Sequence, residues 1–168
     1  MKRFLSLFLI LLLFCFSSCR EEALPTQGEI PVLPQEFAFD GGSITLTNAF
    51  RQISPVSFAS SSLSVSLSRS AFSEWEGTEL SADSPLSDFA DAFLAAHHPN
   101  AATEKQGELL FCTLSLKEGD ISVTARLYFF KGADAFRTVQ FSAEDEHFPT
   151  LREQIEEFAS SIRFEPNK

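Results

Sequence analysis

The chain has 168 residues and carries 13 basic against 23 acidic side chains, a formal charge of −10 at neutral pH. This acidic balance argues against a nucleic-acid partner, because binding to phosphate backbones depends on lysine and arginine. A chain of this length suits one domain and leaves no room for two.

The first 18 residues have the pattern of an export signal. Lys2 and Arg3 form a short positive segment, and residues 4–16 are apolar except for Ser6. A helix of that length rises only about 20 Å, short of the roughly 30 Å hydrocarbon core, so a signal peptide is favoured over a membrane span. Its removal would take away two basic residues and leave a formal charge of −12.

The end of this segment, Phe16-Ser17-Ser18-Cys19, resembles the lipobox of bacterial lipoproteins. In that motif a large apolar residue and two small residues precede an invariant cysteine. The resemblance implies cleavage before Cys19 and attachment of acyl chains to it, which would hold the chain at the extracytoplasmic face of a cell membrane. An ordinary secreted protein is the alternative, although a cut after Ser18 would leave bulky Phe16 at the −3 position.

Residues 19–36 are expected to form the lipidated cysteine and a flexible tether. Prolines and a glycine lie there among polar residues, without a helical or strand period. Residues 37–168 are expected to form a single α+β domain. Since Cys15 leaves with the signal and Cys19 carries lipid, Cys112 has no partner for a disulfide within the chain.

Strands are expected where apolar residues alternate with polar ones or form short runs between turn residues. These places are residues 44–46, 56–58, 63–68, 108–116, 121–130 and 135–142. The last three segments are separated by short turns that contain glycine, which predicts an antiparallel meander.

Two helices are expected. The first begins with a cap at Ser84 and Pro85 at its first position, and it ends before Pro99. The second covers residues 149–161, with an apolar stripe that includes Ile155. The strands over 108–116 and 121–130 are apolar on both faces for part of their length. We therefore expect an antiparallel sheet with a helix packed on each face.

The order of strands, helix, meander and closing helix is similar to that of the PsbP/DcrB-like superfamily. The stretch that carries the resemblance is residues 125–141, ARLYFFKGADAFRTVQF, followed by an acidic turn at residues 144–146 and the ending FASSIRF at residues 158–164. The resemblance implies a binding or accessory role, because that superfamily includes extrinsic photosystem subunits and envelope lipoproteins and has no common active site to carry over.

Residues with chemical potential have simpler structural roles in this sequence. His97 and His98 are adjacent, so on a helix they point about 100° apart and do not form a metal-binding pair, with or without His147. Cys112 lies in an apolar strand and is expected to be a buried core side chain. The acidic residues 144–146 lack the spacing of a calcium loop. We expect no enzymatic activity, no metal and no cofactor.

These observations favour a membrane-anchored lipoprotein that acts as a non-catalytic module and binds a protein of the cell envelope. The alternative is a carrier or sensor of a small apolar ligand, because the 15 phenylalanines that follow the signal segment could line a cavity as well as fill a core. Trp75 lies in a polar turn and is the candidate contact residue, although a lone tryptophan also serves as a lid over a core edge.

Overall fold

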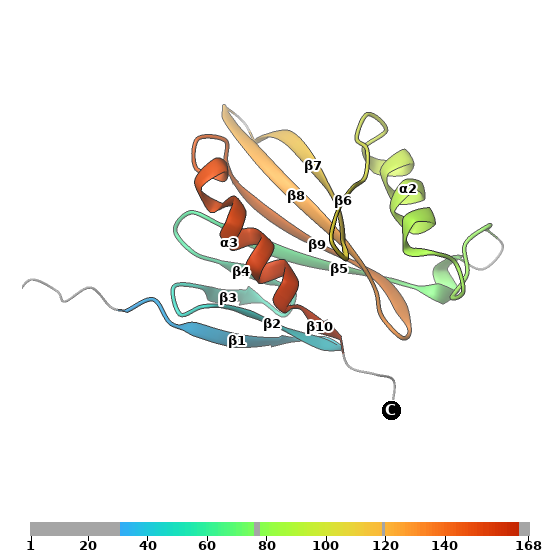
Figure 1. Cartoon of the computed structure of the whole chain (residues 1–168), viewed down its shortest axis with the longest axis horizontal. Coiled ribbons are helices and arrows are strands. Elements are labelled where there is room, and N and C mark those ends of the chain that lie inside the picture. The colour runs from blue at the N-terminus through green and yellow to red at the C-terminus, as the bar shows by residue number, and fades with distance from the viewer. Residues whose placement is uncertain (1–30, 76–77, 119, 165–168) are drawn as a thin grey trace, which may run out of the picture. The chain divides into compact units, whose positions relative to one another are not determined.

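The structure, a computed structural model shown in Figure 1, describes residues 31–75, 78–118 and 120–164. The chain divides into two units, Met1–Pro31 and Val32–Lys168, and every element named below belongs to the second unit. The described residues contain antiparallel sheets and two α-helices, so the predicted α+β class is confirmed.

The larger sheet has seven strands in the order β3-β4-β5-β9-β8-β7-β6, and neighbouring strands are antiparallel. Its strands are β3 (Arg51–Ser54), β4 (Ser57–Ala59), β5 (Ser64–Ala71), β6 (Glu104–Gln106), β7 (Leu109–Glu118), β8 (Ile121–Lys131) and β9 (Ala135–Glu144). The predicted meander is confirmed as β7-β8-β9. The short strands β3 and β6 at the two ends of the sheet were not predicted, because their residues are mostly exposed and show no alternation.

A second sheet has three strands in the order β1-β2-β10, namely β1 (Pro34–Phe39), β2 (Gly42–Thr47) and β10 (Arg163–Phe164). The expectation of one sheet was therefore wrong. Residues 34–36, which were assigned to the tether, pair with β2, so the tether boundary was also wrong. Gly42 allows β10 to approach, because a Cβ at this position would lie 2.3 Å from the carbonyl oxygen of Arg163.

Two hydrophobic clusters hold this unit together, and β8 contributes to both. One cluster combines Ile155 and Phe158 of the last helix with strand residues that include Phe58, Val65, Tyr128, Val139 and Phe141. The other combines Phe89, Ala90 and Leu94 of the first helix with strand residues that include Cys112, Leu127, Phe129 and Phe136. All residues of β8 from 125 to 129 are buried, so this part of the strand is buried on both faces, as its apolar pattern predicts.

Both helices were predicted at nearly the observed positions, α2 at Leu86–His97 and α3 at Phe148–Ser161 (Figure 1). The predicted cap at Ser84 was wrong. The residue before the first turn of α2 is Pro85, which makes no side-chain capping bond, and Oγ of Ser84 instead accepts a hydrogen bond from the N–H of Ser81 at 2.9 Å. The serine hydroxyl thus stabilises the preceding turn and not the helix.

Candidate binding edge on strand β7

Cys19 and the rest of residues 1–30 lie outside the described residues, so lipidation at Cys19 stays a prediction. Within the described parts of the chain, no helix combines the length and the apolar character needed to span a membrane. The side chains discussed below all belong to Val32–Lys168.

Cys112 is fully buried on β7, in the cluster that contains α2. Burial disfavours the thiolate and raises the pKa of the thiol to about 11. At neutral pH the sulfur is therefore a protonated core side chain and not an activated nucleophile, as the strand pattern predicted.

Trp75 ends the short 3₁₀ helix η1 (Phe72–Trp75) and is half-buried. Its ring packs edge-to-face on Phe89 of α2, with 5.7 Å between ring centroids, and it joins the α2 cluster. Its indole Nε1 is buried and has no hydrogen-bond partner among the described residues. This arrangement fits a lid at the edge of the core, the structural alternative to a contact residue.

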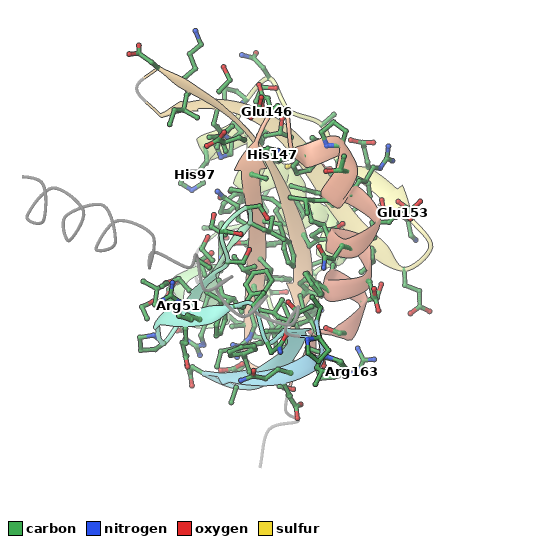
Figure 2. The ribbon with its side chains drawn as sticks, turned by 90° about the vertical axis from the view of Figure 1, so that its left-hand side faces the viewer. Arg51, His97, Glu146, His147, Glu153 and Arg163 are labelled. Carbon is green, nitrogen blue, oxygen red and sulfur yellow. The ribbon has the colours of Figure 1, made fainter. Side chains whose placement is uncertain are left out.

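The three histidines do not come together. His97 and His98 end α2, whereas His147 lies directly before α3, where its imidazole gathers with Glu144 and Glu146 (Figure 2). One ligand atom from each of these last three residues lies within 4.8 Å of the others, and all three side chains are exposed. Exposed charges of this kind commonly gather at turns without a metal, and no metal function is assigned to them.

A partly buried ion pair joins β8 to α3. Nη1 of Arg126 donates to Oε1 of Glu156 at 2.9 Å, and the guanidinium lies 4.5 Å from the ring centroid of Phe111. Glu156 also accepts hydrogen bonds from Gln106 and Arg152. Partial burial opposes the charged form, but these hydrogen bonds outweigh it and hold the pKa of Glu156 below its ordinary value. The carboxylate is therefore ionised and fully engaged, which does not suit a general acid.

A hollow of about 620 Å³ lies beside this pair, between the β6–β7 turn and the C-terminal half of α3. Leu109 and Phe130 give it an apolar part, whereas Glu108, Glu157 and Arg163 give it charged walls. A small and wholly apolar ligand would leave these charges beside it without water, so the hollow does not fit the cavity that a carrier of such a ligand requires.

The outer edge of β7 is open over most of its length. Strand β6 pairs only with residues 109–111 of β7, and it is the last strand on this side of the sheet. Within the described residues, no backbone or side-chain hydrogen bond reaches this outer edge between residues 112 and 118. A row of backbone donors and acceptors therefore faces solvent.

Two tight hairpins determine which backbone groups point outward. In the first hairpin two residues lie between the paired residues Gln106 and Leu109. In the second, two residues lie between the paired residues Glu118 and Ile121. In a two-residue hairpin the closing pair exchanges both backbone hydrogen bonds, and the direction of these bonds alternates along the strand. Leu109 therefore bonds to β6 and Glu118 bonds to β8. Both hairpins give the same result for the residues between them: the N–H and C=O groups of Thr113, Ser115 and Lys117 point outward.

A hollow of about 390 Å³ lies along this open edge. One wall is β7 from Thr113 to Leu116, and the other is formed by the end of α2 and the following loop, residues 97–101. The hollow exists because the chain between α2 and β6 leaves the sheet edge before residue 112. We call this hollow the β7 wedge. In the β7 wedge, unpaired backbone groups lie next to the apolar side chains of Leu114 and Leu116.

The β7 wedge was not among the candidate sites from sequence. The sequence contains part of the information that identifies the wedge. Gly107-Glu108 and Gly119-Asp120 are the short turns that determine which backbone groups of β7 point outward. The length of β6 gave no signal, because Glu104, Lys105 and Gln106 are all polar and exposed. Only the structure shows that pairing stops after three residues.

Neither a family model nor a curated protein matches the chain. A solved structure of the cyanobacterial PsbP protein (CyanoP) from Synechocystis sp. PCC 6803 is similar over 84% of this chain and 98% of its own, at 16% identity and a TM-score of 0.44. A crystal structure from Bacteroides thetaiotaomicron is similar over 80% of this chain, at 12% identity and a TM-score of 0.42, and the chain spans 42% of that protein. Similarity at this level carries no argument about activity, ligand or partner.

Proposed function

We propose that the chain is a lipid-anchored protein of the cell envelope, held through Cys19 at the extracytoplasmic face of a membrane, and that it acts there by binding a protein partner without catalysis. The observation that carries the binding role is the open edge of β7 beside the β7 wedge. An edge with unpaired backbone groups next to apolar side chains is a surface on which another chain can form specific contacts.

This proposal includes a helix on each face of the larger sheet. It is supported by the way in which β8 divides its side chains, with Tyr128 in the α3 cluster and its neighbours Leu127 and Phe129 in the α2 cluster. Coverage on both faces by helices would leave the edges as the parts of the sheet that are open to a partner.

The carrier alternative has less support. It needs an enclosed apolar cavity, whereas the hollow against α3 has charged walls and the β7 wedge is lined partly by His97, His98 and Ser115. Catalysis also has little support from the candidate residues, since the thiol of Cys112 is buried and protonated and Glu156 is engaged by three donors.

Site-specific photocrosslinking in intact cells tests the binding role. A photoreactive benzophenone amino acid replaces Ser115 at the open edge in one protein and Glu153 on the exposed face of α3 in the control (Figure 2). We expect a discrete crosslinked product from position 115 and none from position 153. Equal products from both positions, or no product from position 115, would contradict the proposal.

Trp75 remains a proposed contact in this scheme, although it lies in the α2 cluster and not in the β7 wedge. The variant Trp75→Ala, combined with the photoreactive residue at position 115, tests it separately. A weaker crosslink at unchanged folding would support contact by Trp75, whereas an unchanged crosslink would remove this residue from the proposed surface.

A further inference from the structure

We infer that the partner binds as an extended segment that adds a strand to β7, with its backbone bonded to Thr113, Ser115 and Lys117 and its side chains beside the β7 wedge. This inference rests on the proposed function, since it specifies how a protein partner is held. It adds the backbone conformation of the bound segment and the pattern of its side chains.

The first step is the direction of the backbone groups. The two hairpins that enclose β7 both assign outward N–H and C=O groups to residues 113, 115 and 117. Three residues at alternate positions are the pattern that a neighbouring β-strand requires. β6 already pairs in this way with residues 109–111, so the bound segment would continue the line of an existing strand.

The second step is the space available. The wedge is bounded on its far side by residues 97–101, so the segment would lie between that loop and β7. A hollow of about 390 Å³ admits part of one extended chain. A second copy of this chain would instead bring a whole sheet edge, and β6 and the loop both stand in its way. A single segment of another protein is therefore the occupant that the geometry fits.

The third step is the choice of side chains. Leu114 and Leu116 point to the α2 side of the sheet and pack in its cluster, whereas Thr113 and Ser115 are exposed on the other side. Directly opposed residues on neighbouring strands interact, and aliphatic or β-branched pairs are favourable. The bound segment should therefore carry apolar residues at alternate positions, with threonine or other polar residues between them.

The edge also lacks the usual protection against pairing. Natural edge strands are often blocked by charges, prolines or bulges. Between residues 112 and 117, Lys117 is the only charged side chain and there is no proline, and the register of β7 with β8 is continuous from Leu110 to Glu118. A continuous edge of this kind accepts an added strand.

Amide hydrogen exchange measures the proposed backbone bonds directly. The probe is a nine-residue synthetic peptide in which valine alternates with threonine between two terminal lysines. Saturating peptide should slow exchange at the amides of residues 113, 115 and 117 by about tenfold or more, and should leave the amides of β3 at the opposite edge unchanged. A peptide of the same sequence with N-methyl groups at alternate positions should give no protection. Absence of protection by the first peptide, or equal protection by both, would overturn strand addition.

The variant Ser115→Pro removes the central outward N–H without removing a bond to β8, and proline is tolerated at edge positions of this kind. Ser115→Ala is the matched control, because it keeps the N–H and loses only the hydroxyl. We expect the proline variant to weaken peptide binding by about tenfold or more and the alanine variant to bind like the parent. If the proline variant does not fold, Thr113→Pro and Thr113→Ala make the same comparison.

The same variants separate this inference from the proposed function. The photoreactive residue is then placed at position 117. A crosslink that is kept in Ser115→Ala but lost in Ser115→Pro supports strand addition. A crosslink that is equally strong in both variants would leave a protein-binding role but overturn strand addition. If the protein that keeps Ser115 and carries the photoreactive residue at position 117 gives no crosslink, the binding role itself is contradicted. A crosslinked homodimer, confirmed by its mass in solution, would assign the edge to a second copy and overturn the single-segment occupant.

Discussion

Arg69 and Arg137 lie directly opposite each other on the neighbouring strands β5 and β9, and both guanidinium groups bind the same carboxylate, Asp134. Like charges in opposed positions destabilise a sheet, and Arg137 has only 8% of its side chain exposed. The carboxylate at 2.6 Å from Arg69 and 3.1 Å from Arg137 offsets this repulsion. Asp134 is therefore needed at the end of the sheet where β9 begins.

We expect Asp134→Asn to lower the free energy of unfolding by about 1–3 kcal/mol, because a buried guanidinium would lose its counter-charge. Chemical denaturation of the two proteins measures this difference. Asp83→Asn is the control, since Asp83 is exposed and forms no ion pair among the described residues, and its effect should stay within about 0.5 kcal/mol. Equal effects of both substitutions would contradict the role assigned to Asp134.

The stability that Asp134 provides should depend on pH. The hydrogen bond from Arg69 lowers the pKa of Asp134 most strongly, burial opposes it, and the hydrogen bond from Arg137 adds to the lowering, so the pKa lies below its ordinary value. A carboxyl group whose pKa is lowered by folding stabilises fully above its unfolded pKa of about 3.9, and this contribution is lost as the pH falls through the folded pKa. The difference in unfolding free energy between the parent and Asp134→Asn should be constant at neutral pH and decrease below about pH 4. A difference that does not change down to pH 2 would count against this origin.

The ion pair between Arg126 and Glu156 should contribute more than the surface charges of the same helix. Arg126 has 5% of its side chain exposed, so Glu156→Gln leaves a buried charge without its partner. We expect a loss of about 2–4 kcal/mol, somewhat below the range for a fully buried pair because Glu156 keeps contact with water. Glu153→Gln on the exposed face of α3 should change stability by less than about 0.5 kcal/mol, and thermal or urea unfolding separates the two outcomes.

Cys112 should be protected from thiol reagents in the folded protein. The side chain is fully buried and its thiol pKa is raised to about 11, so both access and thiolate formation are limited. In a variant that lacks Cys15 and Cys19, labelling should be slow at neutral pH and rapid in denaturant. Cys112→Ser should cost about 1–3 kcal/mol if its hydroxyl finds no partner, and Cys112→Ala shows the cost of lost volume alone. Rapid stoichiometric labelling without denaturant would mean that β7 opens readily.

Lipidation is tested at Cys19 itself. Cells that grow with a clickable fatty-acid analogue should label the parent protein and not Cys19→Ala, and the variant should keep its signal segment and migrate differently. Cys112→Ala is the control for labelling at an unrelated cysteine. Equal labelling of the parent and Cys19→Ala would reject the anchor.

Elements with strong periodicity could be predicted from the sequence, and elements defined by their neighbours could not. Core burial selects apolar residues at regular spacing. This spacing appears in the sequence as the alternation in β5, the apolar runs of β7 and β8 and the apolar stripe of α3. β3, β6 and β10 have two to four residues each and little buried surface. They form because their backbones pair with the edge of an adjacent strand. The sequence of the short strand alone does not indicate this pairing.

The same distinction applies to the candidate site. Burial of Cys112 follows from its apolar neighbours and was predicted. The β7 wedge follows from the point where the chain after α2 turns away from the sheet, which depends on where α2 ends and on how far β6 pairs. Ser84 shows the limit for single residues, because its hydroxyl accepts a hydrogen bond from Ser81 in the preceding turn and does not cap the helix.

The three-stranded sheet also has a mechanical consequence. β1 is the first strand of the folded unit and has a single hydrogen-bonded neighbour, β2, to which it is joined in six residue pairs. A force that arrives from the N-terminal side is therefore borne first by the β1–β2 pairs, whereas β7 lies near the far end of a different sheet. The force is therefore applied to β1, whereas the partner is proposed to bind at the edge of β7. Tension on the chain could detach β1 while the edge of β7 keeps its conformation.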